Sequence, residues 1–290
     1  MLQSMTGFGK ATSTFANKKI TVEIKSLNSK NLDLFVRMPS VYRQNEIGLR
    51  KVLEKALDRG KVECNINVEV IGTGSTQQLN ATLIKSYYEQ LSKIGGELNI
   101  GLENIMATLV KMPDVFASEA EELNEDEWDA IVAVLNSAIE EHINFRAEEG
   151  ARLAEEFTLR IANIKSAFDQ IPAYENTRIA SIKERIENNL EEFVGISKID
   201  KNRFEQELIY YLEKFDISEE KHRLENHLTY FMETLNKDQS QGKKLGFITQ
   251  EIGREINTLG SKSYHAEMQK LVVGMKDELE KIKEQVLNTL

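Results

Sequence analysis

The chain contains few of the residues that cross-link or interrupt a fold. Its 290 residues include one cysteine, three prolines and 16 glycines. The single cysteine, Cys64, excludes an internal disulfide, and no metal-ligand motif surrounds it. It stands in an alternating apolar segment, which indicates a buried structural thiol. The scarcity of proline favours long, uninterrupted helices.

Long apolar runs and targeting signals are absent as well. No stretch approaches the ~20 apolar residues that a membrane span needs. The start of the chain, Met1–Gly7, has no basic region followed by an apolar core and so does not resemble a signal peptide. Charged residues make up 29% of the chain and hydrophobic residues 41%, as is typical of a globular protein. We therefore expect a cytoplasmic protein that makes no contact with a membrane.

Several enzyme signatures are also missing. The sequence has no P-loop, no H-E-x-x-H zinc motif and no recognisable nucleophile arrangement of serine, histidine and aspartate. The glycine pair Gly7 and Gly9 has the spacing of a dinucleotide fingerprint, but no helix is expected behind it. These absences argue against the commonest nucleotide-binding, zinc-protease and serine-hydrolase classes.

The net charge of −10 is distributed unevenly along the chain. Residues 1–75 contain 12 basic and 7 acidic residues, which leaves 25 basic and 40 acidic residues for the remainder. A basic front of +5 therefore precedes an acidic back of −15. Such asymmetry can mark a face that binds nucleic acid, although a small positive balance is a weak signal alone.

The front of the chain has the pattern of an α/β domain over residues 1–78. Apolar residues alternate with polar ones in four segments, which predicts strands at 3–14, 19–27, Leu32–Met38 and 62–70. A helix is expected over about 40–58, with Gly60 as its left-handed cap.

Everything after residue ~80 has helical periodicity. Helices are expected at Leu79–Ile94 and Leu102–Leu109, and one very long helix at Glu125–Phe168. Residues 179–193 would return along this helix, giving a long hairpin within a second region, 79–200. A C-terminal helical domain, 201–290, would follow. The fold class is thus α+β, a small mixed sheet followed by long helices. A hairpin so narrow cannot hide both apolar stripes, so we expect it to pack on another subunit.

The first group of candidate residues lies at the start of an acidic helix. At 100° per residue, one arc holds two carboxylates, a guanidinium and an imidazole, from Asp216, Glu220, Arg223 and His227. Carboxylates can hold Mg²⁺ or Mn²⁺, and an imidazole can transfer protons near neutral pH. The structural alternative is that Asp216 caps the helix and that Glu220 and Arg223 form a surface ion pair.

The second group lies on the following helix, whose buried stripe is Leu245, Ile248, Ile252, Ile256 and Leu259. Glu251 and Glu255 line one flank, and Arg254 lies on the other with Gln250 and Asn257. The helix would end at Gly260, next to Lys262, and His265 and Glu267 follow on the first turn of the last helix. A plain surface helix closed by a glycine cap is the alternative.

A third, basic group surrounds two turns of the front domain. It consists of Lys25, Asn28, Lys30, Arg37, Arg59 and Lys61. Lysine and arginine neutralise phosphates, and asparagine can bond a base edge or a 2′-hydroxyl. Phe8, Phe35 and Tyr42 could stack on bases, but core positions are the simpler interpretation. The basic residues could also form an ordinary solvated face.

These segments resemble the motifs of the YicC/YloC family in the family's order, from about residue 2 to residue 288. In the front they are Ser4–Gly9, Glu23–Asp33 and Arg59–Glu63, and in the middle Arg146–Gly150. In the back they are Asp216–Glu220, Arg223-Leu224, His227, Gln250-Glu251, Arg254–Thr258, Gly260–Lys262 and Val272–Lys276. Several ordered motifs at matching spacing are far more specific than any single one.

The resemblance implies a divalent-metal-dependent endoribonuclease that forms hexamers and encloses RNA in a channel. The chain departs from the family pattern in places. Lys25 and Leu27 stand where arginine and valine are frequent, so the cation at 25 lacks a bidentate fork. Tyr264 and His265 stand where asparagine and aspartate are common, which leaves the role of position 265 open.

We therefore predict an endoribonuclease that acts on single-stranded or structured RNA with Mg²⁺ or Mn²⁺ as cofactor. The expected metal ligands are Asp216, Glu220, Glu251, Glu255 and Glu267, and the expected catalytic groups are His227, Glu220 and Glu255. RNA would be held by the basic group of the front domain together with Arg223, Arg254 and Lys262. The alternatives are a non-catalytic adaptor that delivers RNA to other RNA-decay nucleases, and a purely structural oligomer.

Overall fold

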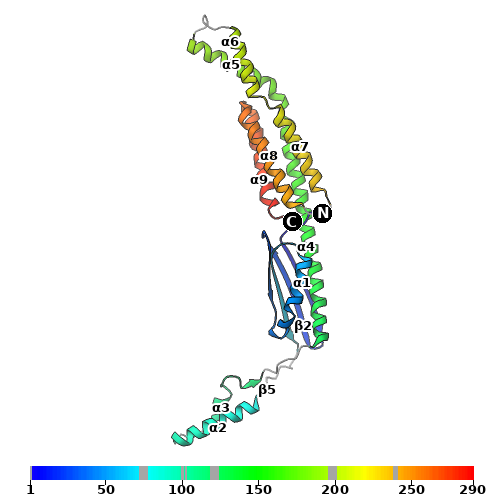
Figure 1. Cartoon of the computed structure of the whole chain (residues 1–290), viewed down its shortest axis with the longest axis vertical. Coiled ribbons are helices and arrows are strands. Elements are labelled where there is room, and N and C mark those ends of the chain that lie inside the picture. The colour runs from blue at the N-terminus through cyan, green and yellow to red at the C-terminus, as the bar shows by residue number, and fades with distance from the viewer. Residues whose placement is uncertain are drawn as a thin grey trace.

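The computed structural model describes residues 2–71, 78–98, 101, 103–117, 124–194, 201–237 and 241–290. Figure 1 shows a long, narrow molecule with a small sheet in the middle, a helical bundle toward one end and a small helical arm at the other. This architecture confirms the α+β class. In the described part of the chain, no helix is both long and apolar enough to span a membrane.

The sheet follows the alternation of the sequence. It comprises β1 (Gly7–Phe15), β2 (Lys18–Leu27), β3 (Leu32–Arg37) and β4 (Gly60–Val70) in the order β1-β2-β4-β3. Only β3 and β4 run parallel. The buried residues of β2 and β4 alternate with more exposed ones over Ile20–Ser26 and Gly60–Ile66. They include Cys64, and burial raises the pKa of its thiol to about 12. Cys64 is therefore the inert structural thiol that the sequence predicts.

Three details of the front domain differ from expectation. The first strand begins at Gly7 rather than residue 3. The helix expected over 40–58 is a 3₁₀ helix, η1 (Ser40–Asn45), followed by α1 (Glu46–Ala56), which ends where Leu57 becomes extended. Gly60 does not cap this helix, because it is the first residue of β4 and its φ is +120°. The positive φ that glycine permits is thus used for strand entry.

Helix α4 (Glu125–Phe168) is the long central helix of the molecule, and its bounds are those that the periodicity predicts. Its first half buries Ile131 and Leu135 against the sheet and α1. Its second half buries Phe157 and Ile164 in a separate core formed by the C-terminal helices. One helix therefore connects two hydrophobic cores, and its apolar stripe is covered within a single chain.

The return arm of the hairpin is α7 rather than the segment at 179–193. Helix α5 (Pro172–Val194) packs against α6 (Lys201–Lys214), and α7 (Ser218–Leu235) runs back along α4. The Phe157 and Phe231 rings meet edge to face at 6.1 Å between α4 and α7, and Lys165 pairs with Glu225 at 2.9 Å. The apolar stripes expected to require another subunit are thus partly buried by the chain itself.

Two more helices complete the C-terminal bundle. Helix α8 (Gly242–Ser263) packs between α7 and α9 (Ala266–Val286), and α9 also packs on α4. Helix α9 buries one apolar side in this bundle, through Met268, Met275, Leu279, Ile282 and Val286, and Leu271 is partly buried. Gly260 lies inside α8, not at its end. A Cβ there would meet Val272 Cγ1 at 2.9 Å, so this glycine permits close packing of α8 on α9. Tyr264, with a φ of 39°, ends the helix.

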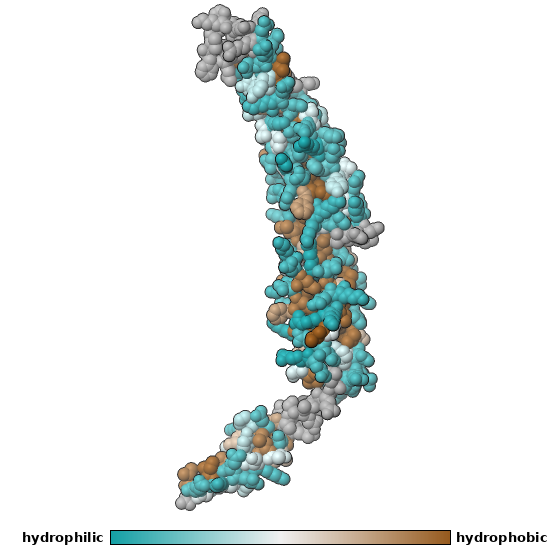
Figure 2. All heavy atoms as spheres, in the orientation of Figure 1, coloured by the Kyte–Doolittle hydropathy of each residue, from teal (hydrophilic) through white to brown (hydrophobic). Residues whose placement is uncertain are grey.

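The arm consists of α2 (Ala81–Leu98), α3 (Ile105–Leu109) and a two-stranded ladder of β5 (Gln78–Leu79) and β6 (Phe116–Ala117). Its small core includes Leu109 and Val115. Figure 2 shows hydrophobic side chains on its surface, and Tyr88, Ile94, Leu98 and Met106 are among those exposed. The predicted domain borders, 78/79 and 200/201, fall beside residues 72–77 and 195–200, which are outside the described residues, so that division stays a prediction.

The two ends of the chain meet between the sheet and the bundle (Figure 1). Ser4 forms an isolated β-bridge with Thr289, and the Met5 amide donates to the Asn288 carbonyl at 2.7 Å. The Leu290 amide donates in turn to the Gln3 carbonyl at 3.0 Å. We call this meeting of residues 2–6 and 288–290 over α4 the junction.

Candidate functional site on helices α7 and α8

The predicted acidic residues of the back half meet across the contact of α7 and α8. Glu220 lies in the first turn of α7 and is buried, with 6% of the residue exposed. Lys262 reaches it from the end of α8, with Nζ 2.7 Å from Glu220 Oε1. The same Nζ donates to the Asp216 carbonyl at 3.0 Å. One lysine thus fixes the loop before α7 to the end of α8.

A second acid–base pair lies further along the same contact. Glu255 of α8 is buried, with 5% exposed, and its Oε1 lies 4.0 Å from an Arg223 guanidinium nitrogen. Arg223 itself is half exposed and also pairs with Glu219 of its own helix. A buried carboxylate stays ionised only beside a positively charged or hydrogen-bonding partner. The half-exposed Arg223 is the cation that stabilises Glu255.

The Asp216 side chain stabilises the turn that leads into α7. It precedes α7, and its Oδ1 accepts hydrogen bonds from the Ser218 amide at 3.2 Å and the Ser218 hydroxyl at 2.8 Å. The hydrogen bond from the Ser218 hydroxyl, helped by nearby amides and Lys262, lowers the pKa of Asp216 below its ordinary value. The expectation that Asp216 shares one helical arc with Glu220 and His227 is therefore wrong. The structural alternative holds only in part, because Ile217 is the N-cap residue of α7 and Arg223 pairs with Glu219 and Glu255 rather than with Glu220.

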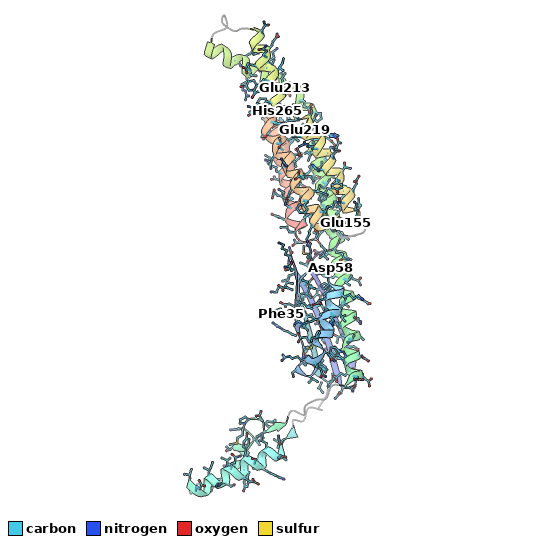
Figure 3. The ribbon with its side chains drawn as sticks, in the orientation of Figure 1. Phe35, Asp58, Glu155, Glu213, Glu219 and His265 are labelled. Atoms are coloured by element: carbon cyan, nitrogen blue, oxygen red, sulfur yellow. The ribbon has the colours of Figure 1, made fainter. Side chains whose placement is uncertain are left out.

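The remaining candidates of this region are spread over its surface. Glu251 is exposed on α8, and Glu267 is exposed on α9, where it pairs with Lys270. His227 is half buried on α7, two turns beyond Glu220. His265 is the N-cap residue of α9 and not part of its first turn; its ring lies 5.3 Å from the Tyr174 ring. Figure 3 shows His265 and Glu219 together at the end of the bundle farthest from the sheet.

The candidate carboxylates of Glu220, Glu255 and Glu267 form separate ion pairs and do not converge around one point where a metal ion could bind. Across the described residues, no three side chains of histidine, cysteine, aspartate or glutamate lie close enough to hold a metal ion. Glu220 Oε2 is nevertheless buried without a hydrogen-bond partner, which leaves one carboxylate oxygen available. A divalent cation prefers six or more oxygen ligands or several retained waters. The described residues of one chain therefore do not fit a metal site built from protein ligands alone.

Three of the predicted RNA-binding residues lie on the outer face of the sheet, opposite α4. Lys25, Arg37 and Lys61 are exposed there, and Lys25 pairs with Glu23 at 2.7 Å. Phe35 is 60% exposed and lies on the side of the sheet away from α4 (Figure 3). Phe8 is 39% exposed, with the Lys25 ammonium over its ring. The core interpretation is therefore wrong for both phenylalanines. It is confirmed for Tyr42, which is buried and donates to Glu127.

The other three lie at the end of the sheet that faces the bundle. Asn28 donates to the Leu287 carbonyl at 2.7 Å, and Arg59 donates to the Thr289 carbonyl at 2.6 Å. Both therefore hold the C-terminal segment, in addition to any contact with RNA. Lys30 is exposed at the turn. These residues line a groove with the start of α8, where Lys243 and Phe247 join them.

Sequence reasoning missed Lys243 and Phe247, although a signal was present. The buried stripe of α8 runs through Leu245 and Ile248, so a phenylalanine at 247 falls off it and must face solvent. An exposed phenylalanine beside two lysines is unusual for a surface helix.

The fold and these charges define an elongated α+β protein with a basic groove and a helix pair rich in buried acid–base pairs. The family description "Endoribonuclease YicC-like, N-terminal region" matches residues 2–155, and "Endoribonuclease YicC-like, C-terminal" matches residues 171–289. The chain belongs to this YicC-like endoribonuclease family.

Two curated relatives match along the whole chain. The "Probable endoribonuclease YicC" of Clostridioides difficile (strain 630) is 33% identical over 294 residues, which covers 99% of both proteins. The protein with the same description from Haemophilus influenzae (strain ATCC 51907 / DSM 11121 / KW20 / Rd) is 29% identical over 289 residues, again with 99% of both covered. The resemblance on which the sequence interpretation depends is thereby confirmed.

Proposed function

We propose that this protein is an endoribonuclease and that the contact of α7 and α8 is where it cleaves RNA. The observation that carries the proposal is the pair of buried carboxylates, Glu220 and Glu255, each held by a cation that solvent can reach. Family membership over nearly the whole chain gives the reaction class, because both curated relatives are described as probable endoribonucleases.

The two acid–base pairs have the elements that phosphodiester cleavage requires. Arg223 and Lys262 can turn from their carboxylates toward a phosphate, because 54% and 30% of their side chains are exposed. A phosphate bound there would leave a carboxylate without its cation, close to the reacting group. Such a carboxylate can accept a proton from the attacking hydroxyl or water, and the half-buried His227 can transfer a proton nearby.

Metal dependence is a separate part of the proposal. A divalent cation would offset charge on the phosphorane-like transition state. Its ligands would include the free oxygen of Glu220 and, since the described residues contain no three converging donors, oxygens of RNA or water. Glu251, Glu255, Glu267 and Asp216 remain candidates as predicted.

A non-catalytic adaptor is the second candidate function, and one observation favours it. Glu220 and Glu255 pair with Lys262 and Arg223, as they would if these charges served only to join two helices. In that case RNA would bind the basic surface and another nuclease would cut it.

Conservative amide substitutions distinguish the two functions. If the carboxylates act in cleavage, Glu220→Gln and Glu255→Gln should each slow the cutting of RNA at least about tenfold while RNA still binds. Glu280→Gln is the matched control, because Glu280 is an exposed partner of Lys283 on α9. Cleavage rates and RNA affinity of purified protein are measured with EDTA and with Mg²⁺ or Mn²⁺ added back. No cutting of RNA by the parent protein would favour the adaptor. Parent cleavage rates in both variants would place the cleaving residues elsewhere, and equal cutting in EDTA would remove the metal.

The protein is also proposed to act as a closed oligomer, with six subunits as the resemblance implies. The apolar surface of the arm supports this, because Leu98 and Met106 are about 60% exposed. Light scattering at micromolar concentration should report a multiple of the 33.1 kDa chain mass. A monomer under these conditions would contradict the prediction.

A further inference from the structure

The groove at the junction of the sheet and the bundle stands apart from the α7 and α8 pairs. It has a volume of about 380 Å³ and lies between the turn after β2, the residue before β4 and the start of α8. The polar and aromatic side chains that line it are Asn28, Lys30, Arg59, Lys243, Phe247 and Gln250. Residues more than 200 positions apart in the sequence thus form one surface.

The charge of this groove is opposite to that of the chain as a whole. Its described lining contains three cations, Lys30, Arg59 and Lys243, and no acidic side chain, although the net charge of the protein is −10. Among the described residues, neither Lys30 nor Lys243 has a carboxylate partner, whereas Lys25 and Lys283 are both paired. Unpaired lysines around a concave surface favour a polyanion.

Phe247 adds an aromatic surface to this charge. It is 68% exposed, the largest exposed fraction of any phenylalanine among the described residues. Exposing a phenylalanine to water is unfavourable, and single-stranded RNA gains affinity when a base stacks on such a ring. One turn further along α8, Gln250 offers an amide that can bond a base edge or a 2′-hydroxyl.

The floor of the groove is kept open by glycine. A Cβ at Gly246 would meet only Val286 Cγ1, at 3.5 Å, which is ordinary contact. A side chain can therefore be placed at 246 without strain, and it would fill the space between α8 and the end of α9. Alanine or a longer residue is also a better helix former than glycine.

We infer that this groove binds single-stranded RNA, with one base stacked on Phe247 and the flanking phosphates held by Lys30 and Lys243. From here the exposed side of α8 continues through Gln250, Arg254 and Asn257 toward Lys262. The groove is thus an entry subsite that aligns RNA with the proposed cleavage site. In this respect it rests on the proposed function, but RNA binding in the groove is measurable without any cleavage.

The test measures the affinity of the full-length protein for a short labelled single-stranded RNA by fluorescence anisotropy, over a range of salt concentrations. A denaturing gel confirms that the RNA stays intact. Phe247→Ala should weaken binding about tenfold, the loss expected for one stacked base. In the double variant Lys30→Ala, Lys243→Ala, affinity should depend less on salt. The magnitude of the negative slope of log affinity against log salt should fall by about 1.4, since each lost phosphate contact contributes about 0.7.

Gly246→Met is the variant that keeps every charge and the ring. It should weaken RNA binding at least about tenfold by filling the groove, while its melting temperature stays at or above that of the parent. The matched controls are Ile47→Ala, which removes another exposed apolar side chain of the front domain, and Lys51→Ala, which removes an exposed cation of α1. Both controls should bind RNA like the parent.

Three results would overturn the inference. The first is parent affinity in both Phe247→Ala and Gly246→Met. The second is a loss of affinity in Phe35→Ala instead, which would place RNA on the outer face of the sheet. The third is a change of oligomer size in the groove variants without a change in RNA affinity, which would make the groove an interface between copies. Weakened binding together with a parent protein that never cuts RNA would uphold the groove and refute the proposed function. If the parent protein cuts RNA and the groove variants keep the parent RNA affinity, the proposed function is upheld and RNA binding in the groove is refuted.

Discussion

The junction and the exposed side of α8 contain motifs of the same resemblance, yet they use their residues in opposite ways. At the junction, Arg146 of the motif Arg146–Gly150 is buried, with 2% of the residue exposed, and His142, which belongs to none of the motifs, is buried beside it. On α8, Gln250, Arg254 and Asn257 all face solvent. A motif shared within a family can therefore serve either the fold or a surface, and only burial and contacts distinguish the two.

The junction motifs form one buried network. The Arg146 guanidinium donates to the Met5 carbonyl at 3.1 Å and to the Arg59 carbonyl at 3.2 Å. The Ser26 hydroxyl donates to the same Met5 carbonyl at 2.9 Å, so His142 Nε2 must carry the proton that it shares with Ser26, at 2.8 Å. Burial without a carboxylate partner lowers the pKa of Arg146 to about 10. The Arg146 guanidinium thus binds backbone carbonyls inside the protein and is not on the surface where RNA could reach it.

A large effect is expected from a single methyl group at the junction. A Cβ at Gly150 would lie 2.1 Å from the Leu2 carbonyl oxygen, so Gly150→Ala forces the N-terminal segment off α4. Strain of about 3 kcal/mol, less a helix-propensity gain of about 1 kcal/mol, should lower the free energy of unfolding by about 2 kcal/mol. Gly274→Ala is the control, because nothing lies within 4 Å of its Cβ, and it should stabilise α9. Equal urea midpoints for the two variants would contradict this.

A comparable effect should appear as a pH dependence that originates at the junction. Burial, with help from the charge of Arg146, lowers the pKa of His142 from 6.5 to about 4. The unfolded chain therefore binds a proton that the folded chain does not, so stability is complete above pH 6.5 and falls as the pH decreases toward 4. The loss amounts to about 3 kcal/mol over this window.

His142→Gln retains a polar group and removes the titration. Urea unfolding of both proteins between pH 4 and 7 should show a shallower pH dependence in the variant. Parallel curves would mean that His142 is not the titrating group.

The last comparison separates a structural from an exposed cation on α8. Lys262→Met leaves Glu220 buried without its partner and should cost about 2 kcal/mol, at the low end for a buried pair because Lys262 is partly exposed. Arg254→Ala removes an exposed charge and should change stability by less than about 0.5 kcal/mol. Thermal unfolding measures both. A stable Lys262→Met variant would mean that this ion pair does not join the two helices.

Local patterns predicted the elements of this fold better than their partners. The bounds of α4 and the alternation of β2 and β4 follow directly from periodicity. Periodicity does not say which helix covers an apolar stripe, and so the return along α4 was assigned to residues 179–193 instead of α7. The glycines were misread for the same reason. Gly60 and Gly260 look like helix caps in the sequence, but a strand entry and a close helix contact require them.

The pairing of the candidate site residues could not be predicted from the sequence. Glu220 and Glu255 were identified from spacing, and the structure places each against a cation of the opposite helix. The groove could not be foreseen, because Lys30 and Phe247 belong to segments that meet only in the folded chain.

The meeting of the chain ends also sets an order of events during synthesis. The bridge from Ser4 to Thr289 and the bond from Leu290 to Gln3 join residues made first to residues made last. Until the ribosome has added residues 288–290, the Gln3 carbonyl and the Met5 amide lack their partners. The sheet and the first half of α4 can form earlier, since the core that they share lies within residues 11–143. The closing contact has the longest loop in the molecule and so the largest entropic cost of closure. The nascent protein therefore exists for a time as a folded front half whose two ends have not yet been joined.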